Sequence, residues 1–312
     1  MNVAFLFPGQ GSQSVGMGKE LHENFPAARL VFEEASDALS INMARLCFEG
    51  PESELKLTQN TQPAVLTVSI SAFRAIEAES GANPVVSAGH SLGEYSALVA
   101  TGALGLADAV RLVRDRGKFM QEAVPEDEGA MAAVIGMDAT SVDDLAREVA
   151  DETDRVVVPA NYNAPDQVVI SGHADAVEAA AERAKEHGAK RVVFLNVSAP
   201  FHSPLMKPAA ERLAGKLAET PFNEAQTPVI ANVDAAPYIE PEKARDMLEQ
   251  QVCSPVLWAQ SMEKLADFEI ESAVELGPGK VLTGLLKKIN RELQCMPVGD
   301  AKGLKDALAM RI

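Results

Sequence analysis

The sequence predicts an α/β protein in which a large domain with a parallel sheet is interrupted by a smaller inserted domain. Three observations lead to this prediction. Short apolar strands alternate with amphipathic helices in residues 1–127, a different order of elements fills residues 128–196, and the first pattern resumes in residues 197–312. A chain of 312 residues is also long enough for both domains and a sizeable buried core.

The large domain begins with a buried strand and a glycine-rich turn. Residues 3–7 are apolar, and the turn covers residues 8–19. It is neither a dinucleotide-binding loop nor a Walker loop, because Ser14 and Met17 stand where those motifs need glycine and lysine. Helical periodicity then covers residues 17–39 with a break near Pro26, residues 63–79 and residues 107–123.

The inserted segment has its own order of elements. Strands are expected at residues 129–137, 155–161, 167–172 and 190–196, and helices at residues 141–150 and 174–188. The order β-α-β-β-α-β is the ferredoxin-like unit. We therefore expect a small ferredoxin-like domain at residues 128–196, inserted into a large domain made of residues 1–127 and 197–312.

The large domain then resumes as a second run of α/β elements. Helices are expected at residues 203–219 and 279–293, and strands at residues 227–233 and 270–277. These segments should complete the sheet that the first strand begins.

Charge and cysteine content exclude several functions. The chain has 45 acidic and 28 basic residues, a net charge of -17, which disfavours binding to nucleic acid. Its three cysteines are far apart and form no C-x-x-C motif: Cys47, Cys253 and Cys295. This pattern indicates free thiols in a reducing compartment and predicts no metal site.

The N-terminus does not have the pattern of a secretory signal. Basic residues before the apolar run are missing, and Pro8 interrupts that run. No apolar run in the sequence is long enough to span a bilayer. We therefore expect a cytosolic protein that binds no membrane.

A nucleophile motif lies in the stretch VVSAGHSLGEYSALVA, residues 85–100. Gly89, Ser91 and Gly93 fit G-x-S-x-G between an expected strand and an expected helix. In that context the serine occupies a tight turn, the nucleophile elbow, and its hydroxyl projects beside the helix N-terminus, where free N–H groups can hold an oxyanion. We therefore predict a hydrolase-like large domain with Ser91 as nucleophile. The alternative is an ordinary serine in a turn.

A serine hydroxyl needs a base, and the chain offers five histidines: His22, His90, His173, His187 and His202. His202 differs from the others because it lies in NVSAPFHSPLM, an irregular stretch with two prolines where the chain returns to the large domain. Such loops carry function more often than helix faces do. We predict His202 as the base and expect His90 to be structural, because neighbours on a sharp turn point apart.

The positions of these residues weaken, without excluding, an α/β-hydrolase. That fold has the order serine, acid, histidine, with the histidine late in the chain. Here residues 203–312 still follow His202, and the inserted domain separates it from Ser91. A hydrolase and an acyl transferase therefore both remain open at this point.

Seven segments narrow the choice: FLFPGQGSQSVGMG, GHSLGEYSALVA, RGKFMQEAVP, NYNAPDQVVISG, APFHSPLM, QVCSPVLW and ELGPGKVLTGL. Together they resemble the malonyl-CoA:acyl carrier protein transacylases and, more widely, the acyltransferase domains of fatty acid and polyketide synthases. The resemblance extends over the whole chain, and the order and spacing of the segments are more specific than any one of them.

The resemblance implies catalytic roles. Ser91 would accept the acyl group, His202 would be its base, and the backbone carbonyl of Gln251 would orient the imidazole in place of a carboxylate. The oxyanion hole would consist of the backbone N–H groups of Gln10 and Leu92. A neutral orienting group stabilises imidazolium less than an aspartate would, which we suggest suits reversible transfer between thiols.

The resemblance also implies two substrate-binding residues. Arg116 would grip the free carboxylate of a malonyl group, because a guanidinium makes two parallel charge-assisted bonds to a carboxylate. An acetyl group would leave that arginine unpaired in a dry pocket. The ring of Phe201 would crowd an α-methyl branch, with core packing as the alternative.

The implied reaction is ping-pong transfer of malonyl from malonyl-CoA to the phosphopantetheine thiol of acyl carrier protein, which supplies fatty acid synthesis. It requires no metal and no redox cofactor. Two alternatives stay open: a serine thioesterase or esterase, and a non-catalytic acyl-binding scaffold.

Docking of the carrier needs a local basic patch, because acyl carrier protein is acidic in this family and the chain itself has a net charge of -17. The favoured patch lies near the end of the helix expected after GPGK and consists of Lys287, Lys288 and Arg291. A second cluster lies in the small domain and consists of Lys185, Lys190 and Arg191.

Overall fold

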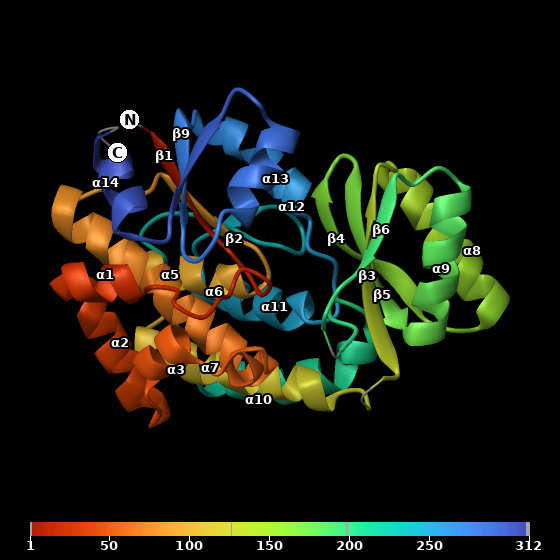
Figure 1. Cartoon of the computed structure of the whole chain (residues 1–312), viewed down its shortest axis with the longest axis horizontal. Coiled ribbons are helices and arrows are strands. Elements are labelled where there is room, and N and C mark those ends of the chain that lie inside the picture. The colour runs from red at the N-terminus through yellow and green to blue at the C-terminus, as the bar shows by residue number, and fades with distance from the viewer. Residues whose placement is uncertain (1, 126, 198, 310–312) are drawn as a thin grey trace.

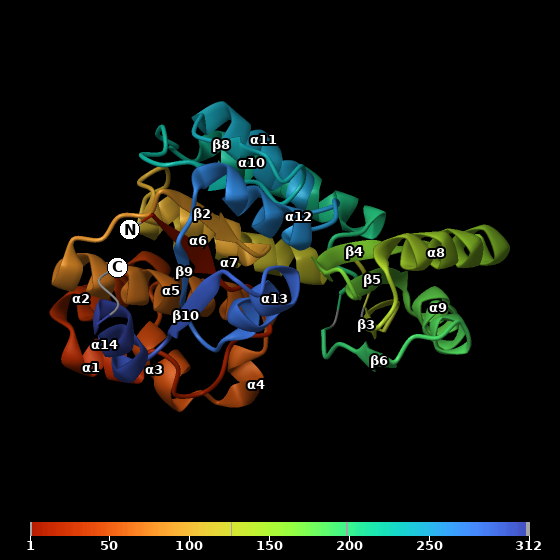
Figure 2. The same cartoon turned by 90° about the horizontal axis from the view of Figure 1, so that it is seen from above.

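The computed structural model describes residues 2–125, 127–197 and 199–309 (Figure 1; Figure 2). A six-stranded sheet in the order β10-β9-β1-β2-β7-β8 forms the centre of the large domain. Its strands are parallel except for β8, which confirms the predicted parallel sheet. The strands are β1 (Val3–Phe7), β2 (Val86–Gly89), β7 (Val229–Ile230), β8 (Pro237–Tyr238), β9 (Ser272–Leu276) and β10 (Gln294–Val298).

Helices cover both faces of this sheet, which explains why β1 is apolar at every position. Phe5 and Phe7 belong to the main core, and Ala4 and Leu6 belong to a separate core on the other face. The main core includes residues of α2 (Pro26–Leu39), α5 (Thr58–Ser80), α6 (Leu92–Ala100) and α7 (Leu106–Glu122). The other core includes residues of α12 (Trp258–Glu263) and α13 (Val281–Ile289).

Helix α5 begins at Thr58, ahead of the start at residue 63 that the periodicity predicts. The turn before Pro63 is held by the Thr61 hydroxyl, which donates to the Leu55 carbonyl at 2.6 Å. The Thr61 N–H donates to the Leu57 carbonyl at 2.8 Å. These local bonds stabilise a turn that apolar spacing alone does not indicate.

The remaining helices complete the large domain. They are α1 (Lys19–Asn24), α3 (Met43–Glu49), α4 (Glu52–Leu55), η1 (Pro204–Met206), α10 (Lys207–Glu219), α11 (Pro241–Gln251), η2 (Lys264–Phe268) and α14 (Ala301–Ala309). No helix of the described residues combines the length and apolar character needed to cross a membrane.

The inserted segment forms a separate antiparallel sheet in the order β4-β5-β3-β6. Its elements are β3 (Gly129–Ile135), α8 (Ala139–Thr153), β4 (Val157–Ala164), β5 (Gln167–His173), α9 (Ala174–Glu186) and β6 (Arg191–Phe194). This topology confirms the predicted ferredoxin-like unit. The exact boundaries at residues 128 and 196 stay a prediction.

The two helices of the small domain lie on the face of its sheet that points away from the large domain (Figure 1; Figure 2). The other face borders a cleft of about 440 Å³ between the domains. Edge strand β4 is joined to the large domain by backbone hydrogen bonds: Tyr162 N–H donates to the Val256 carbonyl, and Val256 N–H donates to the Ala160 carbonyl, both at 2.9 Å. The cleft therefore has one wall from each domain.

Candidate active site

Ser91 lies at the junction of β2 and α6 in a conformation that serine rarely adopts. Its φ is 51° and its ψ is -104°. A positive φ in a residue with a side chain persists only when the surrounding structure holds it. The turn is therefore a strained elbow that presents Oγ at the carboxyl end of the sheet.

The two glycines of G-x-S-x-G permit this turn because no other residue fits. A Cβ on Gly89 would lie 1.9 Å from the carbonyl carbon of Gly93. A Cβ on Gly93 would lie 2.0 Å from the carbonyl oxygen of Phe7, at the end of β1. The two glycines of the motif are therefore required by close backbone contacts on both sides of Ser91.

The imidazole of His202 joins the elbow to the segment that follows α11. Nε2 lies 2.8 Å from Ser91 Oγ. Nδ1 lies 2.8 Å from the Gln251 carbonyl oxygen and 3.2 Å from that of Ser254. Because a carbonyl oxygen only accepts, Nδ1 carries the proton and Nε2 is free to accept the serine proton.

The charge state of His202 follows from its surroundings. Its side chain is buried, and burial together with the Arg116 cation lowers its pKa to about 3. The bond to the Gln251 carbonyl opposes this shift without overcoming it. His202 is therefore neutral near pH 7, as a general base must be before it acts.

Arg116 brings a buried guanidinium into contact with Ser91. It lies on α7 and is 1% exposed. Nη1 donates to Gln62 Oε1 at 2.9 Å, and Nη2 donates to Ser91 Oγ at 3.0 Å and to Gln251 Oε1 at 2.9 Å. These acceptors are neutral, and Nε has no hydrogen-bond partner among the described residues.

The glycine-rich turn after β1 packs directly against the elbow. A Cβ on Gly9 would lie 2.5 Å from the carbonyl oxygen of His90. This contact puts the Gln10 backbone beside the elbow, and the hydrogen bonds among the described residues include none from the Gln10 N–H. Leu92 is the first residue of α6, so its N–H has no acceptor within the helix. Both N–H groups suit an oxyanion hole.

The chain matches the acyl transferase domain family over residues 4–306. It is 51% identical over 306 residues to a malonyl CoA-acyl carrier protein transacylase of Bacillus subtilis, and the match covers 98% of this chain and 96% of that relative. The chain belongs to the acyl transferase family. The resemblance predicted from its motifs is confirmed.

Solved acyl transferases share the whole fold. The malonyl CoA-acyl carrier protein transacylase of Coxiella burnetii superposes with a TM-score of 0.96 at 43% identity, covering 99% of this chain and 97% of that one. A malonyl-transacylase in complex with the holo acyl carrier protein of a type II polyketide synthase also gives a TM-score of 0.96, at 44% identity and with 99% and 100% coverage. These likenesses confirm the predicted two-domain fold.

In this acyl transferase, sequence reasoning missed the residue that holds the elbow. Asn232 Oδ1 accepts from the Ser91 N–H at 2.6 Å, and Asn232 Nδ2 donates to the Gly89 carbonyl at 2.7 Å. Asn232 follows β7 at the carboxyl end of the sheet, where functional side chains of α/β proteins gather. That position could have drawn attention to it.

A second missed residue is Glu94, a carboxylate within the apolar helix α6. It is fully buried, and its charge in the run LGEYSALVA was the available signal. Gln62, which accepts from Arg116, carried no comparable signal because it lies among polar residues before Pro63.

His90 and Phe201 have different surroundings. His90 borders the cleft, and its Nε2 lies 2.8 Å from Asn163 Oδ1 on β4, so the residue expected to be structural links the two domains. Phe201 is buried in the main core next to His202 in the chain. Its selectivity for unbranched acyl groups stays a prediction.

In the favoured carrier patch of Lys287, Lys288 and Arg291, Lys288 differs from the other two because it contacts the small domain. Lys288 Nζ donates to Gln167 Oε1 at 3.0 Å and lies 3.6 Å from an Asp166 carboxylate oxygen, which ties α13 to the β4–β5 turn. Lys287 and Arg291 are exposed, and neither forms an ion pair with a described residue. Lys288 is exposed as well, so what distinguishes Lys287 and Arg291 is that no described carboxylate pairs with them.

Proposed function

We propose that the protein transfers a malonyl group from malonyl-CoA to the phosphopantetheine thiol of acyl carrier protein, through a malonyl ester of Ser91. One observation carries the proposal: the buried Arg116 guanidinium lies 3.0 Å from the nucleophilic oxygen and has only neutral acceptors around it. A cation in that position favours an acyl group that ends in a carboxylate. The relatives named as malonyl transacylases support the same substrate.

The first half of the reaction uses the Ser91–His202 pair. His202 Nε2 takes the proton of Ser91, and Oγ attacks the thioester carbon of malonyl-CoA. The N–H groups of Gln10 and Leu92 stabilise the oxyanion of the tetrahedral intermediate. The C–S bond then breaks, and the proton passes from His202 to the sulfur, so that CoA leaves as a thiol.

The second half repeats these steps with the carrier. The phosphopantetheine thiol gives its proton to His202, its sulfur attacks the ester carbon, and the proton returns to Ser91 Oγ as the ester bond breaks. The neutral Gln251 carbonyl orients His202 in both halves. Because both half-reactions use the same groups, transfer is reversible.

Selection of malonyl depends on the directions of the Arg116 donors. Nη2 hydrogen-bonds Ser91 Oγ, so a carboxylate on an acyl group of Ser91 lies within reach of the guanidinium. The Nε–H, which has no partner among the described residues, supplies a further donor. An acetyl group has no carboxylate to offer and leaves the guanidinium without a charged partner in contact with it.

Two surface features belong to the same proposal. Lys287 and Arg291 at the end of α13 help to dock the acidic carrier at the mouth of the cleft. We also place the enzyme in the cytosol, because Cys47, Cys253 and Cys295 are free thiols, as in proteins of reducing compartments. Its place in fatty acid synthesis follows from the proposed substrates, malonyl-CoA and acyl carrier protein.

Intact-mass measurement after incubation with malonyl-CoA tests the proposal. One malonyl group should be added, it should map to Ser91, and Ser91→Ala should remove it. His202→Ala should slow acylation about 10²–10⁴-fold, the usual contribution of a positioned base. Full labelling of Ser91→Ala would contradict the mechanism.

Addition of holo carrier protein separates the remaining alternatives. Faster transfer to the carrier than release of malonate supports a transferase. Faster release of malonate would identify an esterase, and a wild-type protein that takes no acyl group would be a binding scaffold.

A further inference from the structure

Glu94 is a buried carboxylate that the proposed reaction does not use. It lies on α6, one turn after Ser91, and its exposed fraction is 0%. The ion pairs within 4 Å among the described residues do not include it. A carboxylate is expensive to bury, so it is retained in such a place only where several donors meet it.

Three donors from three segments converge on this carboxylate. Oε2 accepts from the Gln251 side-chain Nε2–H at 2.7 Å and from the Asn232 backbone N–H at 3.1 Å. Oε1 accepts from the Tyr238 hydroxyl at 2.9 Å. An ionised carboxylate satisfies all three donors at once, because it has no proton of its own to place.

Two of these three donors belong to residues that hold the catalytic groups. Gln251 accepts from Arg116 through its side chain and from His202 through its backbone carbonyl. Asn232 fixes the backbone of Ser91 through its own side chain. Glu94 therefore stands one residue away from the nucleophile, the base and the cation.

The amide of Gln251 is held at both ends. The Arg116 guanidinium can only donate, so Gln251 Oε1 faces it, and Nε2 then points to Glu94. Without an acceptor at the position of Glu94, the amide keeps its bond to the Ser91 carbonyl at 3.1 Å and loses the shorter one of 2.7 Å. Rotation of the amide would move Oε1 away from Arg116. The guanidinium would then lose one of the acceptors that fix its orientation.

We propose that Glu94 is a positioning residue that holds the Gln251 amide and, through it, aims Arg116 at the acyl carboxylate. The inference rests on the proposed function, in which Arg116 selects malonyl. The role of Glu94 is geometric: its Oε2 accepts from both Gln251 and Asn232, at a distance from α6 that the length of the side chain sets. Charge at Glu94 is not what the role requires.

Two substitutions separate geometry from charge. Glu94→Gln keeps the length of the side chain, so its Oε1 can accept from Gln251 and Asn232 while its amide donates to the Tyr238 oxygen. Glu94→Asp keeps the charge but draws the carboxylate back by one methylene. Tyr238→Phe is the matched control, because it removes the donor at Oε1 alone.

The measurement is the rate of Ser91 acylation by malonyl-CoA and by acetyl-CoA, on proteins whose folding is verified by circular dichroism and thermal unfolding. Glu94→Asp should lower the malonyl-to-acetyl rate ratio about tenfold or more, since a displacement of about 1 Å in a positioning group can cost up to 10²-fold. Glu94→Gln and Tyr238→Phe should keep the ratio within about threefold of wild type.

Three results would overturn the inference. Equal losses for malonyl and acetyl in Glu94→Asp would show support of the fold alone. A ratio lost in Glu94→Gln and kept in Glu94→Asp would show that charge matters and position does not. If Glu94→Asp does not fold, a lost ratio in Glu94→Gln still refutes the geometric role. Failure of the proposed function would appear separately, as a wild-type protein without a malonyl adduct.

Discussion

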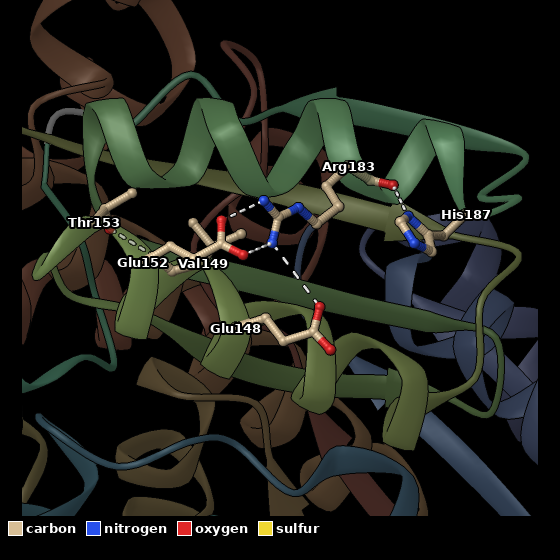
Figure 3. A network of polar contacts seen from close by, with 6 residues as sticks. All are labelled: Glu148, Val149, Glu152, Thr153, Arg183 and His187. Carbon is tan, nitrogen blue, oxygen red and sulfur yellow. Dashed lines mark hydrogen bonds and ion pairs between the residues drawn. The ribbon is translucent and has the colours of Figure 1, made fainter.

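Two arginines, one in each domain, differ in their exposure to solvent and in the charge of their hydrogen-bond acceptors. Arg183, on α9 of the small domain, makes a bidentate pair with Glu152 of α8, with N–O distances of 3.1 and 2.5 Å, and lies 3.9 Å from Glu148 (Figure 3). Its side chain is 28% exposed. Arg116, in the large domain, is buried and has only neutral acceptors among the described residues.

Arg183 forms an ion pair that joins two helices, whereas we propose that Arg116 binds the carboxylate of the acyl group. Arg183 joins α8 to α9 at the surface, where water screens the pair and its contribution to stability is small. The bond from His187 Nδ1 to the Arg183 carbonyl, also drawn in Figure 3, ends the same helix. Arg116 has been desolvated without a carboxylate in contact with it among the described residues, and the charge of Glu94 offsets this burial only from the far side of Gln251. Such an arrangement costs stability, and perturbed charges of this kind cluster at functional sites.

Substitution of Arg116 should give the largest effect. Arg116→Ala should lower malonyl transfer about 10²-fold or more, because two charge-assisted bonds to the acyl carboxylate are lost. Acetyl transfer should be kept or raised, because the unpaired buried cation is gone. Acylation rates from the two CoA esters measure this, with Arg116→Lys as a control that keeps the charge and loses the fork. Equal losses for both esters would assign Arg116 to the fold.

Low pH should lower the stability of the folded protein through the buried imidazole of His202. The pKa of His202 is lowered to about 3, from an ordinary value of 6.5, so the folded state binds fewer protons than the unfolded state between those values. The contribution of His202 to stability therefore falls as pH falls below 6.5, by about 2 kcal/mol between pH 8 and pH 5. Urea unfolding of wild type and His202→Gln at both pH values should show this difference.

Comparison of wild type with His202→Gln separates the pH dependence due to His202 from that due to Glu94, which has the opposite direction. The pKa of Glu94 is raised to about 7, because burial outweighs its hydrogen bonds, so Glu94 makes the protein less stable as pH rises from 4.5 to 7. Glu94 is present in both proteins and cancels in the difference. Parallel pH profiles for wild type and His202→Gln would contradict the prediction.

The parts of the site that follow local rules could be predicted from the sequence. The elbow at Ser91 depends on backbone contacts at Gly89 and Gly93, which leave a readable motif. Asn232 and Glu94 could not be predicted in the same way. Their shared contact spans 138 positions of the chain and arises only when the loop after β7 packs against α6.

The fold shows the same division. The β-α-β-β-α-β order of the small domain is visible because each element is long and periodic. Strand β7 lies within residues 227–233, where the sequence predicts a strand, but it has only two residues. Strand β8 also has two residues, too few to carry a period, and its pairing with β7 depends on the neighbouring sheet. The start of α5 was predicted too late because Thr61 stabilises a turn before Pro63.

Lys287 and Arg291 are exposed cations that form no ion pair with a described residue, so their substitution should have an effect between those of the two arginines. Lys287→Glu with Arg291→Glu should slow transfer to the acidic carrier about tenfold or less at low salt, because rim charges act mainly on the encounter rate. Lys288 is left unchanged because it pairs with Asp166. Acylation by malonyl-CoA should change less, and the difference should shrink in high salt.

The other basic cluster provides the matched control. Lys185→Glu with Arg191→Glu changes charge by the same amount on the far domain and should leave transfer to the carrier near the wild-type rate. If this pair slows transfer at low salt and the Lys287 and Arg291 pair does not, the carrier docks on the small domain.

Arg183→Ala should give the smallest effect and completes the comparison. Its partners are largely exposed, with Glu152 at 60% and Glu148 at 62%, so loss of the pair should change the stability very little. The rate of Ser91 acylation should not change, because α8 and α9 lie on the face of the small sheet away from the cleft (Figure 1). Urea unfolding in low and high salt, together with Glu152→Ala and the double variant, measures the pair directly. A fall in malonyl acylation comparable to that of Arg116→Ala would mean that the small domain sets the acyl pocket through its helix packing, and the distinction between the two arginines would fail.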